Sequence, residues 1–299
     1  MKYIKSCLNY TGGKYRLLKQ ILPFFPDNIN TFLDIFCGGA NVALNVNAKS
    51  IICNDNNTPL INLFNYIKDV DYDDFFQEIK EIIHKYSLSE SDIYGYDYYG
   101  CNSSKGLGKY NKPNYTNLRE DFNLNNIYNM NKCSYFYTLI VFGFNNQIRF
   151  NKQGNFNNPV GKRDFNIRVQ KNLKEFHNTI NKKDIQFVNH DFKDFKVEQF
   201  NSKDFIYLDP PYLITTASYN EQNSWTIDDE KDLLRYLDCL NDNNINFALS
   251  NVLESKGKEN KLLKEWSQNY NINYLNFNYN NSNYQTTKGK SIEVLITNY

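Results

Sequence analysis

The sequence lacks paired cysteines and long apolar runs, and each absence excludes a class of protein. Its six cysteines are scattered, with no CxxC pair. Zinc sites and disulfide frameworks need such spacings, so we predict neither a metal site nor disulfides. No apolar run approaches the roughly 18–20 residues that span a bilayer, and segment 1–18 has no signal-peptide core. We therefore expect a cytoplasmic monomer without a membrane partner.

The sequence also lacks an excess of charge of either sign. Its formal net charge is +1, which does not by itself indicate a nucleic-acid-binding protein, although a basic face can be balanced by acidic residues elsewhere. Apolar residues make up 41% of the 299 residues, and 16% are aromatic. A chain of this length and composition buries a sizeable core, as one large domain or as a core domain with an insertion.

The chain begins with an alternation of strands and helices. An apolar segment at 31–36 leads into small residues at 37–40 and a helix-compatible stretch at 41–48. A second strand at 50–55 leads into a helix at 58–68. This alternation predicts a doubly wound, mostly parallel α/β sheet.

The alternation is interrupted and then resumes. In the interruption we predict helices at 71–86, 132–144 and 166–180, a loop or hairpin at 145–164, and no clear periodicity at 87–130. After it we predict strands at 185–192, 204–209, 245–250, 272–279 and 292–298 and helices near 228–241 and 259–269. These elements predict a split protein, in which a seven-stranded sheet domain (1–65 and 183–299) is interrupted by a mainly helical insertion (66–182).

A rare tetrapeptide, Asp209-Pro210-Pro211-Tyr212, lies at the carboxyl end of a predicted strand, where open α/β sheets bind ligands. A rigid turn with Asp209 as a helix cap is the purely structural alternative. In the functional interpretation, the Asp209 carboxylate and the Pro210 carbonyl accept the two hydrogens of an amine such as adenine N6 and make that amine more nucleophilic. Tyr212 would then stack on a base flipped out of the duplex.

A small-residue turn at 36–40 joins the first predicted strand to the next element. Such a turn lets the backbone approach a ligand closely, although similar turns are common in α/β proteins. Asp55 ends the following strand, where a carboxylate can bind the hydroxyls of a ribose. No GxxxxGK[ST] motif is present, which argues against a nucleoside triphosphate.

A second turn, Tyr10-Thr11-Gly12-Gly13-Lys14, precedes the first predicted strand. An ordinary turn with a solvated lysine is one interpretation. In the other, Lys14 binds the methionine carboxylate of a cofactor, and Tyr10 offers its ring to a positive sulfonium group.

A basic segment, 149–163, lies in the insertion between the two parts of the predicted sheet domain. Residues 149–174 contain seven basic residues and one acidic residue, Asp164. A solvated basic face is possible, but interleaved Arg, Asn, Lys and Phe suit DNA better. Lys and Arg can contact phosphates, Arg or Asn can contact base edges, and Phe can stack.

The order of these motifs resembles the Dam family of DNA adenine-N6 methyltransferases (D12 class, alpha group). YTGGK, FCGGA, a strand ending in Asp55, RFNKQGNFNNPVGK and DPPY follow one another as in that family, and the likeness extends to LSN at 249–251 and EVLITNY at 293–299. The resemblance implies an S-adenosylmethionine-dependent, site-specific methyltransferase that acts on double-stranded DNA. It further implies that residues 66–182 recognise the target, with GATC as a candidate site and a cognate restriction endonuclease as a candidate partner.

The motifs and the resemblance together assign roles to individual residues. For catalysis they are Asp209, Pro210, Pro211 and Tyr212. For S-adenosylmethionine they are Tyr10, Lys14, Phe36, Gly38, Asp55, Asp191, Phe192 and Asp209. For DNA they are Arg149, which matches an arginine that contacts a guanine, Asn151, Lys152, Asn157, Pro159, which matches a proline at the DNA surface, and Lys162.

The sequence departs from the family pattern at several places. Ala40 stands where a glycine is usual, so a positive φ there would carry strain. Tyr10 replaces an aromatic residue of another kind, and the segment 87–125 is long, which leaves the edges of DNA recognition open. Two alternatives also stay open: an amino-methyltransferase that acts on cytosine N4 or on an RNA base, and a DNA-binding protein without catalysis. Asp209 favours adenine, since N4 enzymes resemble a Ser-Pro-Pro pattern.

Overall fold

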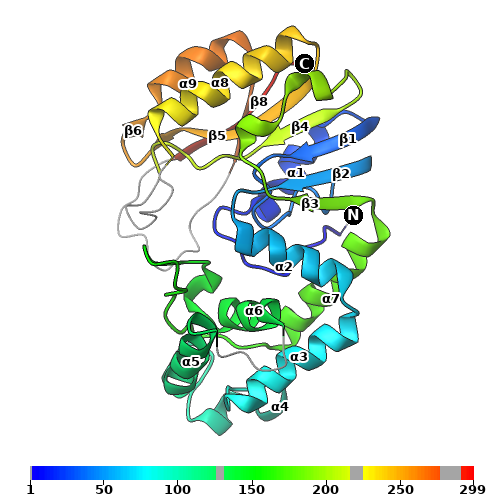
Figure 1. Cartoon of the computed structure of the whole chain (residues 1–299). Coiled ribbons are helices and arrows are strands. Elements are labelled where there is room, and N and C mark those ends of the chain that lie inside the picture. The colour runs from blue at the N-terminus through cyan, green and yellow to red at the C-terminus, as the bar shows by residue number, and fades with distance from the viewer. Residues whose placement is uncertain (1, 126–130, 216–224, 277–290) are drawn as a thin grey trace. The chain divides into compact units, whose positions relative to one another are not determined.

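The computed structural model describes residues 2–125, 131–215, 225–276 and 291–299. The chain divides into two compact units (Figure 1). The sheet unit contains Lys14–Asn57 and Lys183–Tyr299, and the helical unit contains Lys2–Gly13 and Thr58–Lys182. The assignment of cofactor binding and DNA recognition to these units stays a prediction.

The sheet unit is built on a mostly parallel sheet. Its strands are β1 (Ile29–Asp34), β2 (Ala48–Asn54), β3 (Ile185–Val188), β4 (Phe205–Leu208), β5 (Asn246–Ser255), β6 (Lys258–Glu259), β7 (Asn271–Leu275) and β8 (Ser291–Thr297). Seven of them lie in the order β3-β2-β1-β4-β5-β8-β7, and the short β6 pairs with β5. Neighbours from β3 to β5 are parallel, whereas β8 is antiparallel to both β5 and β7. The predicted α/β class is confirmed, with β6 as an additional strand.

The strand order changes direction at β1, which fixes where a ligand can bind. β1 pairs with β2 on one side and with β4 on the other. In open α/β sheets the crevice for a ligand lies at such a switch point, outside the carboxyl ends of the strands. The turn after β1 and the DPPY segment after β4 therefore lie at the position where this fold binds ligands.

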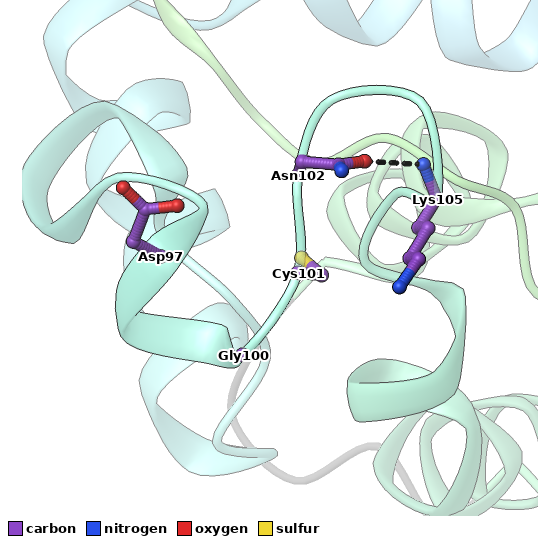
Figure 2. A pocket seen from close by; sticks show the side chains of 5 residues that line it. All are labelled: Asp97, Gly100, Cys101, Asn102 and Lys105. Carbon is purple, nitrogen blue, oxygen red and sulfur yellow. Dashed lines mark hydrogen bonds between the residues drawn. The ribbon is translucent and has the colours of Figure 1, made fainter.

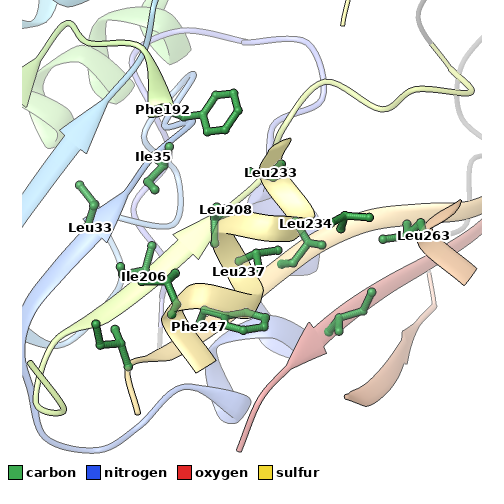
Figure 3. Packing of buried hydrophobic residues seen from close by; sticks show 14 of the residues in the cluster. Leu33, Ile35, Phe192, Ile206, Leu208, Leu233, Leu234, Leu237, Phe247 and Leu263 are labelled. Atoms are coloured by element: carbon green, nitrogen blue, oxygen red, sulfur yellow. The ribbon is translucent and has the colours of Figure 1, made fainter. Parts of the chain in front are cut away.

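The main apolar core of the sheet unit lies under helix α8 (Ile227–Asp242). Thr226 and Asp229 cap this helix reciprocally, since the Thr226 hydroxyl accepts from Asp229 N (3.1 Å) and the Asp229 carboxylate accepts from Thr226 N (3.0 Å). Leu233, Leu234 and Leu237 of this helix then pack in one cluster with buried residues of β1, β4 and β5 (Figure 3). The other α-helices of this unit are α1 (Leu18–Ile21) and α9 (Lys261–Trp266).

The helical unit is arranged around one buried helix. Its helices are α2 (Thr58–Asp69), α3 (Tyr72–Lys85), α4 (Ser91–Tyr94), α5 (Gly108–Asn123), α6 (Lys132–Phe142) and α7 (Ile167–Lys182). Every residue of α6 from Ser134 to Phe142 is buried, and α2, α3 and α5 all contact it. A helix that is buried all round is the core of its unit. None of the described helices is long and apolar enough to cross a membrane.

The predicted helix at 41–48 is wrong, because this segment forms turns. In an α-helix the carbonyl of Asn41 would accept from the backbone N–H of Asn45. Here it accepts instead from the Asn45 side chain (2.8 Å), and the Asn45 backbone N–H donates to Val42 (2.9 Å). An asparagine side chain thus competes with the backbone for the helical hydrogen bond.

Three other differences concern one helix that was not predicted and the ends of two strands. Helix α5 lies inside the segment 87–130, where the sequence showed no periodicity. β3 ends at Val188, short of the predicted 192, and β7 ends at Leu275. The strand predicted at 272–279 therefore does not include Asn276, and its residues 277–279 lie outside the described residues.

Candidate active site

The DPPY segment leaves β4 at the carboxyl edge of the sheet, and its first and last residues are joined. The Asp209 Oδ2 atom lies 2.7 Å from the ammonium of Lys14, which is 5% exposed. The Tyr212 hydroxyl donates to Asp209 Oδ1 (2.9 Å), and Lys14 Nζ lies 5.0 Å from the centre of the Tyr212 ring. Pro210 between them is buried and Pro211 is exposed. The structure thus brings Lys14 to the predicted catalytic residues and fixes the orientation of the Asp209 carboxylate.

A second carboxylate from β8 joins this cluster. Glu293 Oε1 lies 3.7 Å from Lys14 Nζ and accepts a long hydrogen bond from the Tyr212 hydroxyl (3.5 Å). Sequence reasoning missed Glu293, although a charged residue inside the apolar strand SIEVLIT was a signal. One ammonium here faces two carboxylates, so the cluster suits a positively charged ligand.

Two opposing effects act on the pKa of the Asp209 carboxyl. Burial raises the pKa of the Asp209 carboxyl, because desolvation disfavours its charged form. The nearby Lys14 ammonium and the hydrogen bonds from Lys14 and Tyr212 act in the opposite direction on the pKa. Lys14 is therefore the main group that favours the ionised carboxylate, and Tyr212 assists it.

Asp34, the last residue of β1, is a further acid at this edge that sequence reasoning missed. It is 1% exposed, and within the described part of the chain its Oδ1 atom has no hydrogen-bond partner. Burial and the charges of Asp209 and Asp55 raise the pKa of Asp34 well above its usual value. A buried carboxyl with an unsatisfied oxygen is costly to keep, and such groups gather at functional sites. An acid directly before the small-residue turn was the signal in the sequence.

The turn after β1 has a positive φ at Ala40, the condition under which that position would carry strain. Gly38 and Ala40 both have positive φ, 46° and 57°. Asp55 Oδ2 accepts from the backbone N–H of Gly38 (3.0 Å), and its Oδ1 accepts from Asn57 N (2.9 Å). Burial raises the pKa of Asp55, while these two hydrogen bonds lower it. Asp55 thus connects the end of β2 to the turn after β1.

A buried asparagine, Asn54, links the two loops on this side of the site. Its amide nitrogen donates to Ile35 O (2.9 Å) and His190 O (3.1 Å), and its oxygen accepts from His190 N (2.9 Å). The turn after β1 and the loop after β3 are therefore held in fixed register, which sequence reasoning did not foresee.

The loop after β3 places Asp191 and Phe192 differently from each other. Asp191 is exposed, and its carboxylate accepts from Lys193 N (2.9 Å) as the cap of a short 3-10 turn. Phe192 is buried and packs against Phe36 and Trp225, each at 5.7 Å between ring centroids. Phe36 and Trp225 also meet edge to face at 5.7 Å. These three rings form an aromatic cluster next to the turn.

Trp225 was not predicted, and a buried carboxylate holds it. The Trp225 indole N–H donates to Glu230 Oε2 (2.6 Å), and Asn260 donates to Glu230 Oε1 (2.8 Å). Burial raises the pKa of Glu230, which is fully buried in α8. No sequence motif marks this pair, although its residues lie five positions apart at the start of α8.

Tyr10 belongs to the helical unit, whereas Lys14 belongs to the sheet unit. The Tyr10 carbonyl accepts from Gly13 N (3.2 Å), which closes the YTGGK turn. Its predicted cofactor contact stays a prediction.

The predicted DNA segment forms a hairpin in which several polar side chains bond to one another. Phe150 and Phe156 pair in an antiparallel bridge. Across it, Arg149 donates from Nε to Asn157 Oδ1 (2.8 Å) and from Nη2 to the Asn157 carbonyl (2.6 Å). Asn151 closes the tip, since its Oδ1 accepts from two backbone N–H groups of the tip. Lys152, Pro159 and Lys162 are exposed.

Helix α5 anchors this hairpin. Asn123 donates to Phe156 O (3.0 Å) and accepts from Phe156 N (2.8 Å), so its amide pairs with the hairpin as a neighbouring strand would. The Tyr115 hydroxyl and Arg119 Nη1 both donate to Asn158 O, at 3.1 and 3.2 Å. The hairpin is therefore held on a helix that sequence reasoning did not predict.

An open pocket of about 310 Å³ also lies in the helical unit (Figure 2). It is lined by Asp97, Gly100, Cys101, Asn102 and Lys105, and the Asn102 side chain accepts from Lys105 N (2.9 Å). None of the predicted site residues lines it.

Comparison with known families agrees with this geometry. The family model for D12 class N6 adenine-specific DNA methyltransferases matches residues 10–281. The chain belongs to this family. The resemblance drawn from the sequence is thereby confirmed.

The D12-class chain has relatives among modification enzymes. It is 42% identical to Type II methyltransferase M.FokI of Planomicrobium okeanokoites and 44% identical to modification methylase StsI of Streptococcus sanguinis, over 99% and 100% of its own length. It spans only 43% of each of these relatives. It is also 32% identical to a DNA adenine methylase of Haemophilus influenzae, over 69% of this chain and 63% of that one.

Proposed function

We propose that the chain transfers a methyl group from S-adenosylmethionine to N6 of adenine in a short site of duplex DNA. The observation that carries this proposal is the Asp209 carboxylate, which is held by Lys14 and Tyr212 at the switch point of the sheet. A preoriented acceptor at this place is what an amine with a delocalised lone pair needs.

The residues around the turn fit S-adenosylmethionine in chemistry. Asp55 offers a carboxylate for ribose hydroxyls, and Phe36 and Phe192 offer an apolar surface for an adenine ring. The unpartnered Asp34 oxygen and the excess of carboxylates suit an ammonium and a sulfonium. When bound, S-adenosylmethionine supplies a methyl group on a positively charged sulfur.

The chain's own residues then act on the target amine. The Asp209 carboxylate and the Pro210 carbonyl accept the two N6 hydrogens, and the face of Tyr212 supports a flipped adenine. As the new C–N bond forms, N6 loses a proton, and Asp209 accepts it. Because burial raises its pKa, Asp209 is a better proton acceptor than an exposed aspartate.

The finer assignments belong to the same proposal. Adenine is favoured over cytosine N4 because Asp209 opens the motif. Two relatives are type II or modification methylases by name, so a restriction endonuclease that acts on the same site is the partner we propose. GATC remains the candidate site from the family resemblance, and a monomer the expected state.

The test is methyl transfer from labelled S-adenosylmethionine to duplex DNA and to RNA, with the modified base identified by mass spectrometry. Asp209→Ala should lower kcat by about 10²–10³, because a preorganised acceptor is lost. Asp209→Asn, which keeps the shape beside Lys14, should lose activity similarly. Asp228→Asn, at an exposed position of α8, is the matched control. Label on cytosine or RNA, or an active Asp209→Ala variant, would contradict the proposal.

A further inference from the structure

Within the hairpin, two polar side chains differ from the rest. The amides of Gln153 and Asn155 are exposed, and within the described residues neither side chain takes part in a hydrogen bond. Only their backbone groups do: Gln153 N and Asn155 N donate to Asn151 Oδ1, at 3.0 and 2.9 Å. Arg149, Asn151 and Asn157, by contrast, are engaged inside the hairpin.

The backbone beneath these two amides is fixed. Asn151 N donates to Asn155 O (2.9 Å), and Gly154 N donates to Asn151 O (2.9 Å). Gly154 has a φ of 78°, which glycine adopts without strain. With the two bonds to Asn151 Oδ1, the tip is closed by its own hydrogen bonds, so the backbone from which the two amides project is fixed.

The lower part of the hairpin is equally constrained. The Phe150 and Phe156 rings meet at 5.5 Å, and each packs on Phe136 of α6, at 5.9 and 5.8 Å. Asn123 of α5 pairs with both backbone groups of Phe156. Rigid support of this kind lowers the cost of ordering a surface when it binds a partner.

We propose that Gln153 and Asn155 are specificity-determining residues that contact adenine edges in the major groove of duplex DNA. An asparagine or glutamine amide matches adenine in two contacts, one to N6 and one to N7. Asn157 is then a positioning residue, which holds Arg149 by Nε and Nη2 and restricts how its guanidinium approaches DNA. The inference rests on the proposed function, because it takes duplex DNA as the ligand.

The experiment selects bound duplexes from a randomised pool with purified protein and sequences them. Gln153→Ala and Asn155→Ala should each reduce the preference for adenine at one position by about 5- to 150-fold, the range expected for one bidentate contact. Gln153→Glu should move the preference at its position from adenine to cytosine, because a carboxylate accepts from cytosine N4. A residue with only a structural role would not change one base for another.

Asn117→Ala, an exposed asparagine of α5 outside the hairpin, is the control and should select the wild-type sequence. All variants are at exposed positions, and their folding is checked by circular dichroism. If every variant selects the wild-type sequence, or if wild-type protein selects none, the inference is wrong. Methylation of the selected duplexes is measured separately. A sequence preference that the variants alter, in a protein that transfers no methyl group, would contradict the proposed function alone.

Discussion

At Asp209, burial and a neighbouring cation act in opposite directions on one carboxyl group. Burial raises the pKa of Asp209, and Lys14, at 2.7 Å, lowers it. An acceptor of N6 hydrogens has to be ionised, so activity should rise with pH through the pKa of Asp209. Lys14 thus sets the lower limit of the active pH range, in addition to any cofactor contact.

Lys14→Met should therefore move the acid limb of the kcat profile to higher pH. Without the ammonium, burial of Asp209 favours its neutral carboxyl, so more alkaline conditions are needed to ionise it. The measurement is kcat against pH at saturating S-adenosylmethionine, which separates the position of the limb from weaker cofactor binding. Lys19→Met, an exposed lysine of α1, should leave the limb unchanged. An unshifted limb in Lys14→Met would show that Lys14 does not control this ionisation.

Site residues that belong to local motifs could be predicted from the sequence. Site residues that depend on the order of the strands in the sheet could not. Asp209 and Asp55 follow strands directly, so their place at the carboxyl edge follows from the pattern alone. Glu293 reaches the same cluster on β8, which is antiparallel and inserted between β5 and β7. Trp225 depends on a hydrogen bond to Glu230 of α8. A single sequence carries no record of the contact between Glu293 and Lys14, which lie far apart along the chain, and no motif marks the local bond between Trp225 and Glu230.

At the scale of elements, α5 was missed because its formation depends on tertiary contacts, whereas the predicted helices show a local apolar pattern. Its buried residues Asn111, Tyr115, Leu118 and Phe122 have helical spacing, but a polar residue begins the stripe. The Asn111 amide is satisfied by Ser89: its Oδ1 accepts from Ser89 N (2.8 Å), and its Nδ2 donates to the Ser89 hydroxyl (2.8 Å). Glycine at its start and Pro113 inside it lower its helix propensity, so tertiary packing stabilises it.

The turn after β1 allows a test of backbone strain. Ala40 is fully buried with a φ of 57°, so Ala40→Val should lower the free energy of unfolding by about 2 kcal/mol or more, since a β-branched residue is poorly compatible with this φ and also overpacks the site. Urea denaturation measures the loss.

The control is Ala43→Val, at a position that is also fully buried but has no positive φ, and it should lower the free energy of unfolding clearly less. Equal losses would mean that crowding alone is responsible. Ala40→Gly should stay within about 1 kcal/mol of wild type, because relief of strain offsets the lost methyl contacts.

At the scale of the whole molecule, a balanced net charge conceals an uneven distribution. The net charge is +1, but the segment 149–174 holds seven basic residues against one acidic residue, and all of it belongs to the helical unit. The acids Asp34, Asp55, Asp209 and Glu293 belong to the sheet unit. This partition supports a division of labour in which the helical unit binds a polyanion and the sheet unit binds a cationic methyl donor.

That division predicts additive effects of two substitutions, one in each unit. Asp55→Ala should weaken S-adenosylmethionine binding by about ten- to a hundred-fold, because a charge-assisted bond to the ribose is lost. Lys171→Ala, at an exposed position of α7, should weaken binding of all duplexes alike and lower the salt dependence by about 0.9 in the log–log slope. Calorimetry for the cofactor and anisotropy at several salt concentrations for DNA measure the two effects. Each substitution should leave the other ligand's affinity unchanged, and in the double variant the free-energy changes should add within about 0.5 kcal/mol. A larger coupling energy would mean that DNA binding and cofactor binding are energetically linked, and the two units would then act as one site rather than as two.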